Sequence, residues 1–490
     1  MLIHSQYLFK FSSRFRWVFC QLETLRHCLP SSVARTLDEL PESLDETYER
    51  VLREIKKPNM GHALRLLQCL VVANRPLFVG ELAEVLAVDF DDPDGIPKLN
   101  TSWRWEDQEQ ALLSSCSSLI AIVNVKDANK KVQEYIFGDV DNNENVSDKG
   151  DKNHAQTVQF SHFSVKEFLT SPRLATPSRD VSHYHIVLET AHTIMAQACL
   201  GVLLRPDDRV DEVVVGKASP LDGYAAQHWV PHAQFGSVSL RLRNPMEWLF
   251  DVDKPYFAGW VRLHDIDDRL RDSPLWHFSS YPVLEASPLY YAALCGFQDL
   301  VEHLVVKYPQ QVNTIGGTYL TPFVAALSGR HFQLARLLHD HGSFVDPRDD
   351  TLWSPLHYAA WSGDIELVQV LVELKADINA RSQGARTPLH GVSFSDSPNG
   401  PKVARYLLEH GANVNARSDM GTPLHRTSRF GKVEIARVLI EHGADMDAED
   451  NDGFTPLQRA SKDGSNEVVR LLLEHGAKQI PSEACSTDLL

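Results

Sequence analysis

The side chains best suited to bind a metal are three histidines at a regular spacing, His357, His390 and His425. A zinc site needs three or four ligands that converge on one point, and imidazole is a common ligand. The intervals between these histidines, 33 and 35 residues, instead match the period of a structural repeat. We therefore expect equivalent structural positions in successive units and no metal.

Another pair, His228 and His232, has the spacing of two ligands on one helical face. Pro231 lies between them, and a proline distorts a helix, so we expect packing near Trp229 instead. Neither HExxH nor GxSxG occurs in the sequence. We predict no catalytic residues and no enzyme activity, although a triad of residues far apart in sequence stays open.

Nucleotide chemistry is not predicted either. A phosphate-binding loop needs the pattern GxxxxGK[ST], which does not occur in the sequence. The pair Gly216-Lys217 lacks the upstream glycine and precedes Ala218. We expect no cofactor. The cysteines are odd in number and have no CxxC pair, which fits a reducing compartment; they are Cys20, Cys28, Cys69, Cys116, Cys199, Cys295 and Cys485.

Length and charge limit the remaining classes. The chain has 490 residues, of which 43% are hydrophobic, so we expect two or three folded parts. A formal net charge of -17 disfavours direct nucleic-acid binding, which needs clustered Lys and Arg, although one domain could carry a small basic face. We expect no membrane span and a cytoplasmic or nuclear location. The basic start, with Lys10, Arg14 and Arg16, leaves mitochondrial import as an alternative.

One pattern recurs six times in the C-terminal two-fifths of the chain, for example as SPLYYAALCG, SPLHYAAWSG and TPLHRTSRFG. The copies begin at Ser287, Thr321, Ser354, Thr387, Thr422 and Thr455, and their prolines are 34, 33, 33, 35 and 33 residues apart. The pattern resembles the ankyrin family, whose unit is a β-turn followed by two antiparallel helices. The resemblance implies an array of about six units over residues 284–484.

The third copy shows why each unit folds this way. Ser354 can cap a helix, and Pro355 can occupy its first turn, where the missing N–H costs nothing. Gly363 offers the positive φ that ends the helix. Leu367 and Leu371 then belong to an apolar stripe at helical spacing, so a second helix must bury one face against its neighbours.

The resemblance also assigns a role to His357, His390 and His425, since in ankyrin repeats a histidine at this place braces adjacent loops by hydrogen bonds. Phe323-Val324 and Gln458 stand there in two units, so we expect weaker bracing.

Two other departures concern the turns. Arg330 replaces the turn glycine of the second unit, and residues 395–401 (SDSPNGP) form an insertion in the fourth unit. The insertion is either an ordinary loop or a feature that recognises a partner.

Recognition by such an array should depend on residues that differ between units, at hairpin tips and on first helices. Tryptophan, tyrosine and arginine are the commonest binding anchors. The predicted partner-binding residues are Tyr358, Trp361, Arg381, Arg386, Arg417, Met420, Arg426, Arg429, Phe430 and Arg459, with Gln383 and Asp419 beside them.

The N-terminal region has a different pattern. Helices are expected from Leu40 to Pro58, from about His62 to Asn74 and from Val79 to Val88, followed by strands near 118–123, 131–137 and 158–161. This order predicts a winged-helix-like α+β segment over residues 14–175, with a disordered acidic loop before the last strand. A helical spacer over 185–280 should join the two halves and cover the first repeat.

A winged helix raises the possibility of DNA binding. The helix that would enter the groove, from Val79 to Val88, contains Glu81 and Glu84 but no Lys or Arg. Two acidic side chains facing phosphate would repel it. We therefore interpret this segment as a protein-packing module.

Four stretches, RWVFCQLETLRHCLP, LPESLDETYERVL, RPLFVGELAEVLAVDF and FSHFSVKEFLTS, resemble in this order the segment after the ATPase domain of fungal NACHT–ankyrin signal-transducing NTPases. The resemblance covers roughly residues 14–275 and implies a link between a nucleotide switch and a repeat sensor, but the switch itself is absent from this sequence.

The sequence thus predicts a mainly α protein with an ankyrin-repeat solenoid that acts as an interaction scaffold or adaptor, with a role in regulation or as a transcription coregulator. A NACHT relative or a transcription factor is a candidate protein partner. The alternative is the truncated sensor arm of a NACHT-type NTPase, whose ATPase would lie upstream of Met1.

Overall fold

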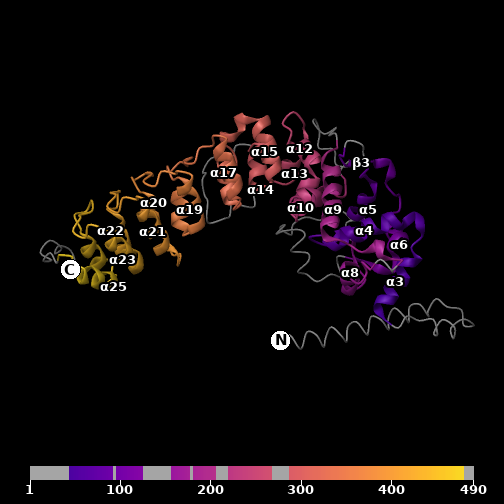
Figure 1. Cartoon of the computed structure of the whole chain (residues 1–490), viewed down its shortest axis with the longest axis horizontal. Helices are drawn as coiled ribbons and strands as arrows, with labels where there is room; N and C mark the ends of the chain where they lie inside the picture. The colour runs from indigo at the N-terminus through magenta and orange to yellow at the C-terminus, as the bar shows by residue number, and fades with distance from the viewer. Residues whose placement is uncertain are drawn as a thin grey trace, which may run out of the picture. The chain divides into compact units, whose positions relative to one another are not determined.

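The computed structural model describes residues 43–91, 95–124, 156–176, 180–205, 219–267 and 286–478. The chain divides into two compact units, Met1–Asp265 and Ile266–Leu490. Helices predominate in both units, and the few strands lie in the first (Figure 1). The predicted strand 131–137, the acidic loop, the Gly216-Lys217 pair and the first 42 residues lie outside the described residues.

The first unit opens with helices close to those expected. Ser43 caps the first helix by accepting a hydrogen bond from the Glu46 amide at 3.2 Å. Its first part consists of α3 (Leu44–Glu54), η2 (Lys57–Asn59), α4 (Met60–Val72), β1 (Leu77–Phe78), α5 (Val79–Glu84), η3 (Val85–Ala87), β2 (Val88–Asp89), β3 (Lys98–Leu99), η4 (Thr101–Trp103), α6 (Gln108–Cys116), η5 (Ser117–Leu119), β4 (Ile120–Asn124), β5 (Gln156–Phe160) and α8 (Phe163–Thr170).

The helix predicted from Val79 to Val88 is shorter in the structure. Helix α5 ends at Glu84, and every residue of it is buried. Glu81 accepts two hydrogen bonds from Arg75, at 2.6 and 2.8 Å, and Glu84 pairs with Arg104, whose Nε donates at 3.0 Å. The two acids therefore neutralise arginines inside the unit instead of facing solvent, and a wholly buried helix has no face to offer to DNA.

A small antiparallel sheet accompanies these helices, in the order β1-β5-β4. Leu77 and Ile122 both pair with Val158, so the short strand β1 and the longer strand β4 flank β5. Strands β2 and β3 form a separate antiparallel pair. Helices joined to a three-stranded sheet are compatible with the winged-helix-like interpretation, which stays a prediction.

The predicted spacer region packs onto the segment before it. Helix α9 lies against both α4 and α10, and all three belong to the first unit. Trp229 and Trp260 meet edge to face at 5.2 Å, and the Trp260 indole donates to the Ala226 carbonyl at 3.0 Å. The elements are η7 (Ser182–Tyr184), α9 (Leu188–Leu203), α10 (Asp222–Ala233), α11 (Val238–Arg241), α12 (Arg243–Leu249) and α13 (Tyr256–Leu263). The expected three-part division of the chain stays a prediction.

The second unit contains six helix pairs within residues 286–478, as the repeats predict. Figure 1 shows the pairs following one another in chain order. They are α14 (Pro288–Cys295) with α15 (Gln298–Lys307), α16 (Pro322–Ser328) with α17 (Phe332–Asp340), α18 (Pro355–Ser362) with α19 (Ile365–Glu373), α20 (Pro388–Val392) with α21 (Gly400–Glu409), α22 (Pro423–Phe430) with α23 (Val433–Glu441), and α24 (Pro456–Lys462) with α25 (Asn466–Glu474); η9 (Pro309–Asn313) follows α15.

The turns after α16 and α18 both reach the left-handed region, in one of them without a glycine. Gly363 ends α18 with φ 71°, and Arg330 adopts the same left-handed region with φ 59°. A left-handed backbone conformation is unfavourable for a residue with a side chain. The Arg330 guanidinium, however, donates hydrogen bonds to Asp364 and Glu366 of the next repeat, each at 2.5 Å. An arginine can therefore serve here because it ties two units together. Residues 395–399 of the insertion lie in the connection between α20 and α21, and Gly400 and Pro401 begin α21.

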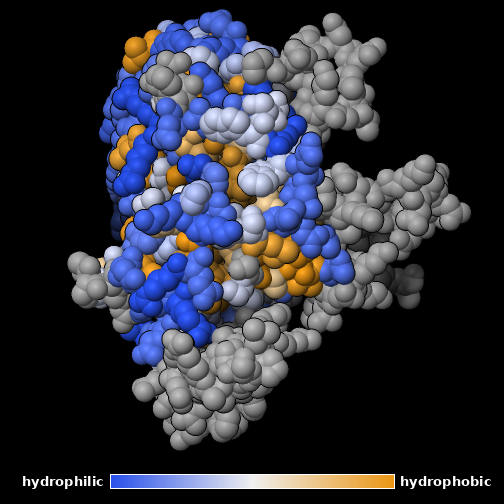
Figure 2. All heavy atoms as spheres, turned by 90° about the vertical axis from the view of Figure 1, so that its right-hand side faces the viewer, coloured by the Kyte–Doolittle hydropathy of each residue, from blue (hydrophilic) through white to orange (hydrophobic). Residues whose placement is uncertain are grey.

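Hydrophobic residues also reach the surface of the first unit. Figure 2 shows them in patches among hydrophilic residues. Trp103 and Trp105 are about half exposed, at 48% and 50%.

Among the described residues, no helix combines the length and apolarity needed to cross a bilayer.

We predict that Arg104→Met lowers the free energy of unfolding of the first unit by about 3 kcal/mol, because it leaves Glu84, 1% exposed, without its counter-charge. Arg243→Met is the matched control, since Arg243 and Glu247 form a surface pair worth at most about 1 kcal/mol. Urea denaturation followed by tryptophan fluorescence measures both. Equal effects of the two substitutions would contradict the structural role of the Glu84 pair.

Candidate functional site

The repeat histidines brace successive hairpins, as expected from the resemblance. The Nδ1 atom of His357 accepts from the Ser354 amide at 3.1 Å, and its Nε2 donates to the Arg386 carbonyl of the next hairpin at 3.0 Å. His390 bonds the Gly421 carbonyl at 3.2 Å in the same way. Each histidine therefore closes the cap of its own helix and holds the hairpin of the following unit.

This geometry requires neutral imidazoles, because Nδ1 must accept a hydrogen bond. Burial lowers the pKa of His357 and of His390 to about 4, and it also lowers the pKa of His425. All three rings are uncharged at neutral pH. Nδ1 now accepts a hydrogen bond from a backbone N–H. If Nδ1 were protonated, its new hydrogen would point at the hydrogen of that N–H, and the bond would be lost.

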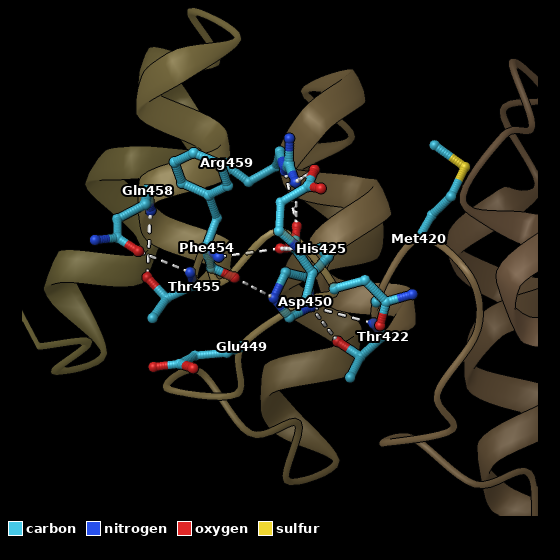
Figure 3. A network of polar contacts seen from close by, with 12 residues as sticks. Met420, Thr422, His425, Glu449, Asp450, Phe454, Thr455, Gln458 and Arg459 are labelled. Carbon is cyan, nitrogen blue, oxygen red and sulfur yellow. Dashed lines mark hydrogen bonds and ion pairs between the residues drawn. The ribbon is translucent and has the colours of Figure 1, made fainter. Parts of the chain in front are cut away.

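Figure 3 shows the last of these braces, where His425 points toward the backbone of Phe454. The histidine Nε2 donates to the Phe454 carbonyl at 3.0 Å. In the final unit Gln458 takes the histidine position and accepts from the Thr455 amide at 2.9 Å, which keeps the helix cap. The glutamine thus preserves the local half of the brace.

Sequence reasoning missed a tyrosine that does the same work in the first unit. Tyr290 occupies the histidine position of its repeat, and its hydroxyl accepts from the Tyr319 amide of the next hairpin at 3.1 Å. The same hydroxyl donates to Asp267 at 2.8 Å, and Asp267 also accepts from the Thr318 amide at 2.5 Å. Its place three residues after Ser287 was the signal that could have identified it.

Three of the predicted partner-binding residues, Tyr358, Trp361 and Arg386, line one pocket of about 530 Å³, which we name the aromatic pocket. The Trp353 ring meets Tyr358 edge to face at 5.0 Å, and the Tyr358 hydroxyl donates to Asp349 at 2.6 Å. Tyr358 is therefore a fixed wall and not a mobile surface group. The full lining is Thr351, Trp353, Tyr358, Trp361, Gln383, Gly384, Arg386 and Asp419.

Three successive hairpins supply the rim of this pocket. The Gln383 amide donates to the Thr351 carbonyl at 2.8 Å, and the Asp419 amide donates to the Gly384 carbonyl at 2.9 Å. The Arg386 guanidinium donates to the Asp419 carboxylate at 2.8 Å and lowers the pKa of that carboxyl group. The rim therefore has a fixed ion pair beside an aromatic interior.

Thr351 and Trp353 were missed as pocket residues. Both residues precede Ser354, where the repeat pattern begins, so they lie outside the pattern from which the binding residues were predicted. A tryptophan directly before the cap residue was a signal that could have been used.

The other predicted residues lie elsewhere on the array. Arg381 and Arg417 are exposed at hairpins, and the Arg417 side chain bonds the Glu449 carbonyl. Four of the predicted residues line a second pocket of about 70 Å³, which we name the arginine pocket. Its lining is Asp419, Met420, His425, Arg426, Arg429, Asp450, Asn451, Asp452 and Arg459.

Arg426, one of the predicted partner-binding residues, is buried and does not lie at the surface. Its side chain is 1% exposed, and its guanidinium carbon lies 3.2 Å from the centre of the Phe394 ring. The Phe394 ring lies 5.3 Å from the half-exposed Phe430 ring at a tilt of 41°, and both rings lie near the arginine. Arg459, by contrast, is engaged with Asp450 (Figure 3), and its Nε donates at 2.9 Å.

Helix α10 continues through Pro231, which lies in its last turn, so His228 and His232 belong to one helix. His232 is buried, and its ring nitrogens lie 2.9 Å from the Tyr224 hydroxyl and 2.9 Å from Nδ1 of His192. Burial lowers the pKa of His232 to about 3. Across the described residues, no three His, Cys, Asp or Glu side chains lie close enough to hold a metal.

The braces predict a pH dependence of stability. The unfolded chain binds protons to histidine near pH 6.5, whereas folded His357 and His390 bind them only near about 4. The free energy of unfolding should therefore fall as the pH drops through this window. Glutamine at positions 357, 390 and 425 should reduce that fall in urea unfolding, and His410→Gln, at an exposed position, should not. An undiminished fall in the triple variant would contradict the assignment.

Comparison with known proteins agrees with this geometry. Residues 289–382 and 389–482 match the family described as ankyrin repeats (3 copies). The azaphilone pigments biosynthesis cluster protein L of Monascus ruber is 28% identical over 321 residues, which are 63% of this chain and 61% of that protein. The ankyrin repeat protein nuc-2 of Neurospora crassa is 28% identical over 148 residues, which are 30% of this chain and 14% of that protein.

A third relative, the human protein phosphatase 1 regulatory subunit 27, is 44% identical over 66 residues, which are 14% of this chain and 41% of that protein. This chain thus spans less than two thirds of the length of each of these relatives. The match to the Monascus protein covers more of this chain than its second unit does, so it includes residues of the first unit. The second unit of this chain is an array of ankyrin repeats.

Proposed function

We propose that this protein is an interaction scaffold or adaptor without enzyme activity, which binds an extended segment of a partner protein through the aromatic pocket. The observation that carries the proposal is that pocket itself, where Trp353, Tyr358 and Trp361 line about 530 Å³ of space. A pocket of this kind accepts one large side chain of a partner and removes its apolar surface from water.

The rigidity of the pocket supports binding. Tyr358 is held by Asp349, and backbone hydrogen bonds join the hairpins at Thr351 and Gln383. A binding site that is already ordered loses little conformational entropy when a partner binds. The Arg386–Asp419 ion pair at the rim offers both signs of charge to the polar groups of a peptide backbone.

The relatives support a regulatory role. One of them is by name a regulatory subunit of a phosphatase, and another belongs by name to a pigment biosynthesis cluster. A NACHT relative or a transcription factor stays the candidate partner for this chain, on the strength of the N-terminal resemblance alone.

The test is a selection of peptides from a random phage-displayed library on the immobilised full-length chain. Trp361→Ala should weaken binding of the selected peptides at least about tenfold, because truncation of a central aromatic anchor costs about 2 kcal/mol or more. Phe344→Ala is the matched control, since Phe344 is an aromatic residue of the same unit that is 66% exposed and lies outside the pocket lining.

Peptides that bind the Trp361 variant as tightly as the original chain would contradict the proposal. Thermal unfolding of both variants controls for loss of the fold.

A further inference from the structure

Arg426 is buried without the hydrogen bonds that a guanidinium normally makes. Its Nη1 faces the Met420 sulfur at 3.1 Å, and its planar group stacks on Phe394. Within the described part of the chain, Nε and Nη2 are both buried and have no acceptor. These two atoms form one edge of the guanidinium, and this edge is the one that binds the two oxygens of a carboxylate.

The acids nearby are already engaged. Asp419 is held by Arg386, whose Nη2 donates at 2.8 Å. Asp450 and Asp452 are both held by Arg459, the latter at 2.8 Å. The remaining charged residue of the arginine pocket is the exposed Arg429, also a cation, and no acid of the lining accepts a hydrogen bond from Nε or Nη2 of Arg426.

Burying a charge without a partner is costly, and contact with an aromatic ring offsets only part of the cost. Burial lowers the pKa of Arg426 to about 9, which still leaves it protonated at neutral pH. The chain therefore maintains a charged, unsatisfied donor pair beside a pocket of about 70 Å³, a volume suited to a group the size of a carboxylate.

We propose that Arg426, with Arg429 at the pocket mouth, binds the carboxylate of an Asp or Glu side chain of the partner segment. This inference rests on the proposed function and specifies the chemistry of the partner. Asp419 lines both the aromatic pocket and the arginine pocket, so the two are adjacent. The preferred ligand is an extended segment with an acidic residue close to a large apolar residue.

The test uses a selected peptide and its amide version, in which Asp or Glu is replaced by Asn or Gln. The amide peptide should bind the original chain about tenfold more weakly, since a hydrogen bond to a charged group is lost. The two peptides should bind Arg426→Met equally. Arg470→Met, which removes an exposed arginine from α25, is the matched control and should keep the difference.

A difference that persists undiminished in Arg426→Met would overturn the inference, as would selected peptides without any acidic residue. A second measurement does not require the substituted chain to fold. In the original chain, the Nε–H nuclear magnetic resonance signal of Arg426 should shift when the acidic peptide binds and stay in place with the amide peptide.

Failure of this inference can be told apart from failure of the proposed function. Peptides that depend on Trp361 but ignore their acidic residue would overturn only the carboxylate site. If no peptide depends on Trp361, titration with sodium acetate still tests the site, because the Arg426 signal should shift with acetate and not with chloride. A signal that ignores acetate would overturn it.

Discussion

The second unit depends on one recurring interaction, a hydrogen bond from the start of a first helix to the hairpin of the next repeat, which four of the repeats make. A neutral histidine makes this bond at His357, His390 and His425, and a tyrosine makes it at Tyr290. A single repeat cannot bury its apolar face alone, so stability comes from contacts between neighbours. The brace fixes the spacing of the hairpins, and it places the surface residues that differ between units at defined distances from one another.

The aromatic pocket is a product of that spacing. Trp353 and Tyr358 come from one unit and Arg386 from the next, while Asp419 reaches the rim from a third. Because His357 holds the Arg386 carbonyl, the brace and the pocket share a residue. The same arrangement explains the arginine pocket, where Arg459 neutralises Asp450 and leaves the Arg426 edge unsatisfied. Framework residues thus hold the site, and variable residues give it its chemistry.

Much of the array could be predicted from sequence because its determinants are local. A hydroxyl residue, a proline and a histidine within four positions specify a cap, a helix start and a brace, and Arg330 takes the turn conformation of the glycine that it replaces. The burial of Arg426 could not be predicted, because it depends on Phe394 of the preceding unit. The buried partners of Glu84 could not be predicted for a similar reason, since Arg104 and Ser219 are distant in sequence. Pro231 was expected to distort a helix that in fact tolerates it in its last turn.

Hydrogen–deuterium exchange of the full-length chain, with and without a bound partner peptide, tests the central claim most directly. We expect slower exchange at the hairpins that line the two pockets, at residues 351–353, 383–386 and 417–421, with little change across the first unit. Amides at the edge of an occupied site lose access to water and open less often. Slower exchange confined to residues 43–267, or to the second helices of the repeats, would contradict the placement of recognition in these pockets.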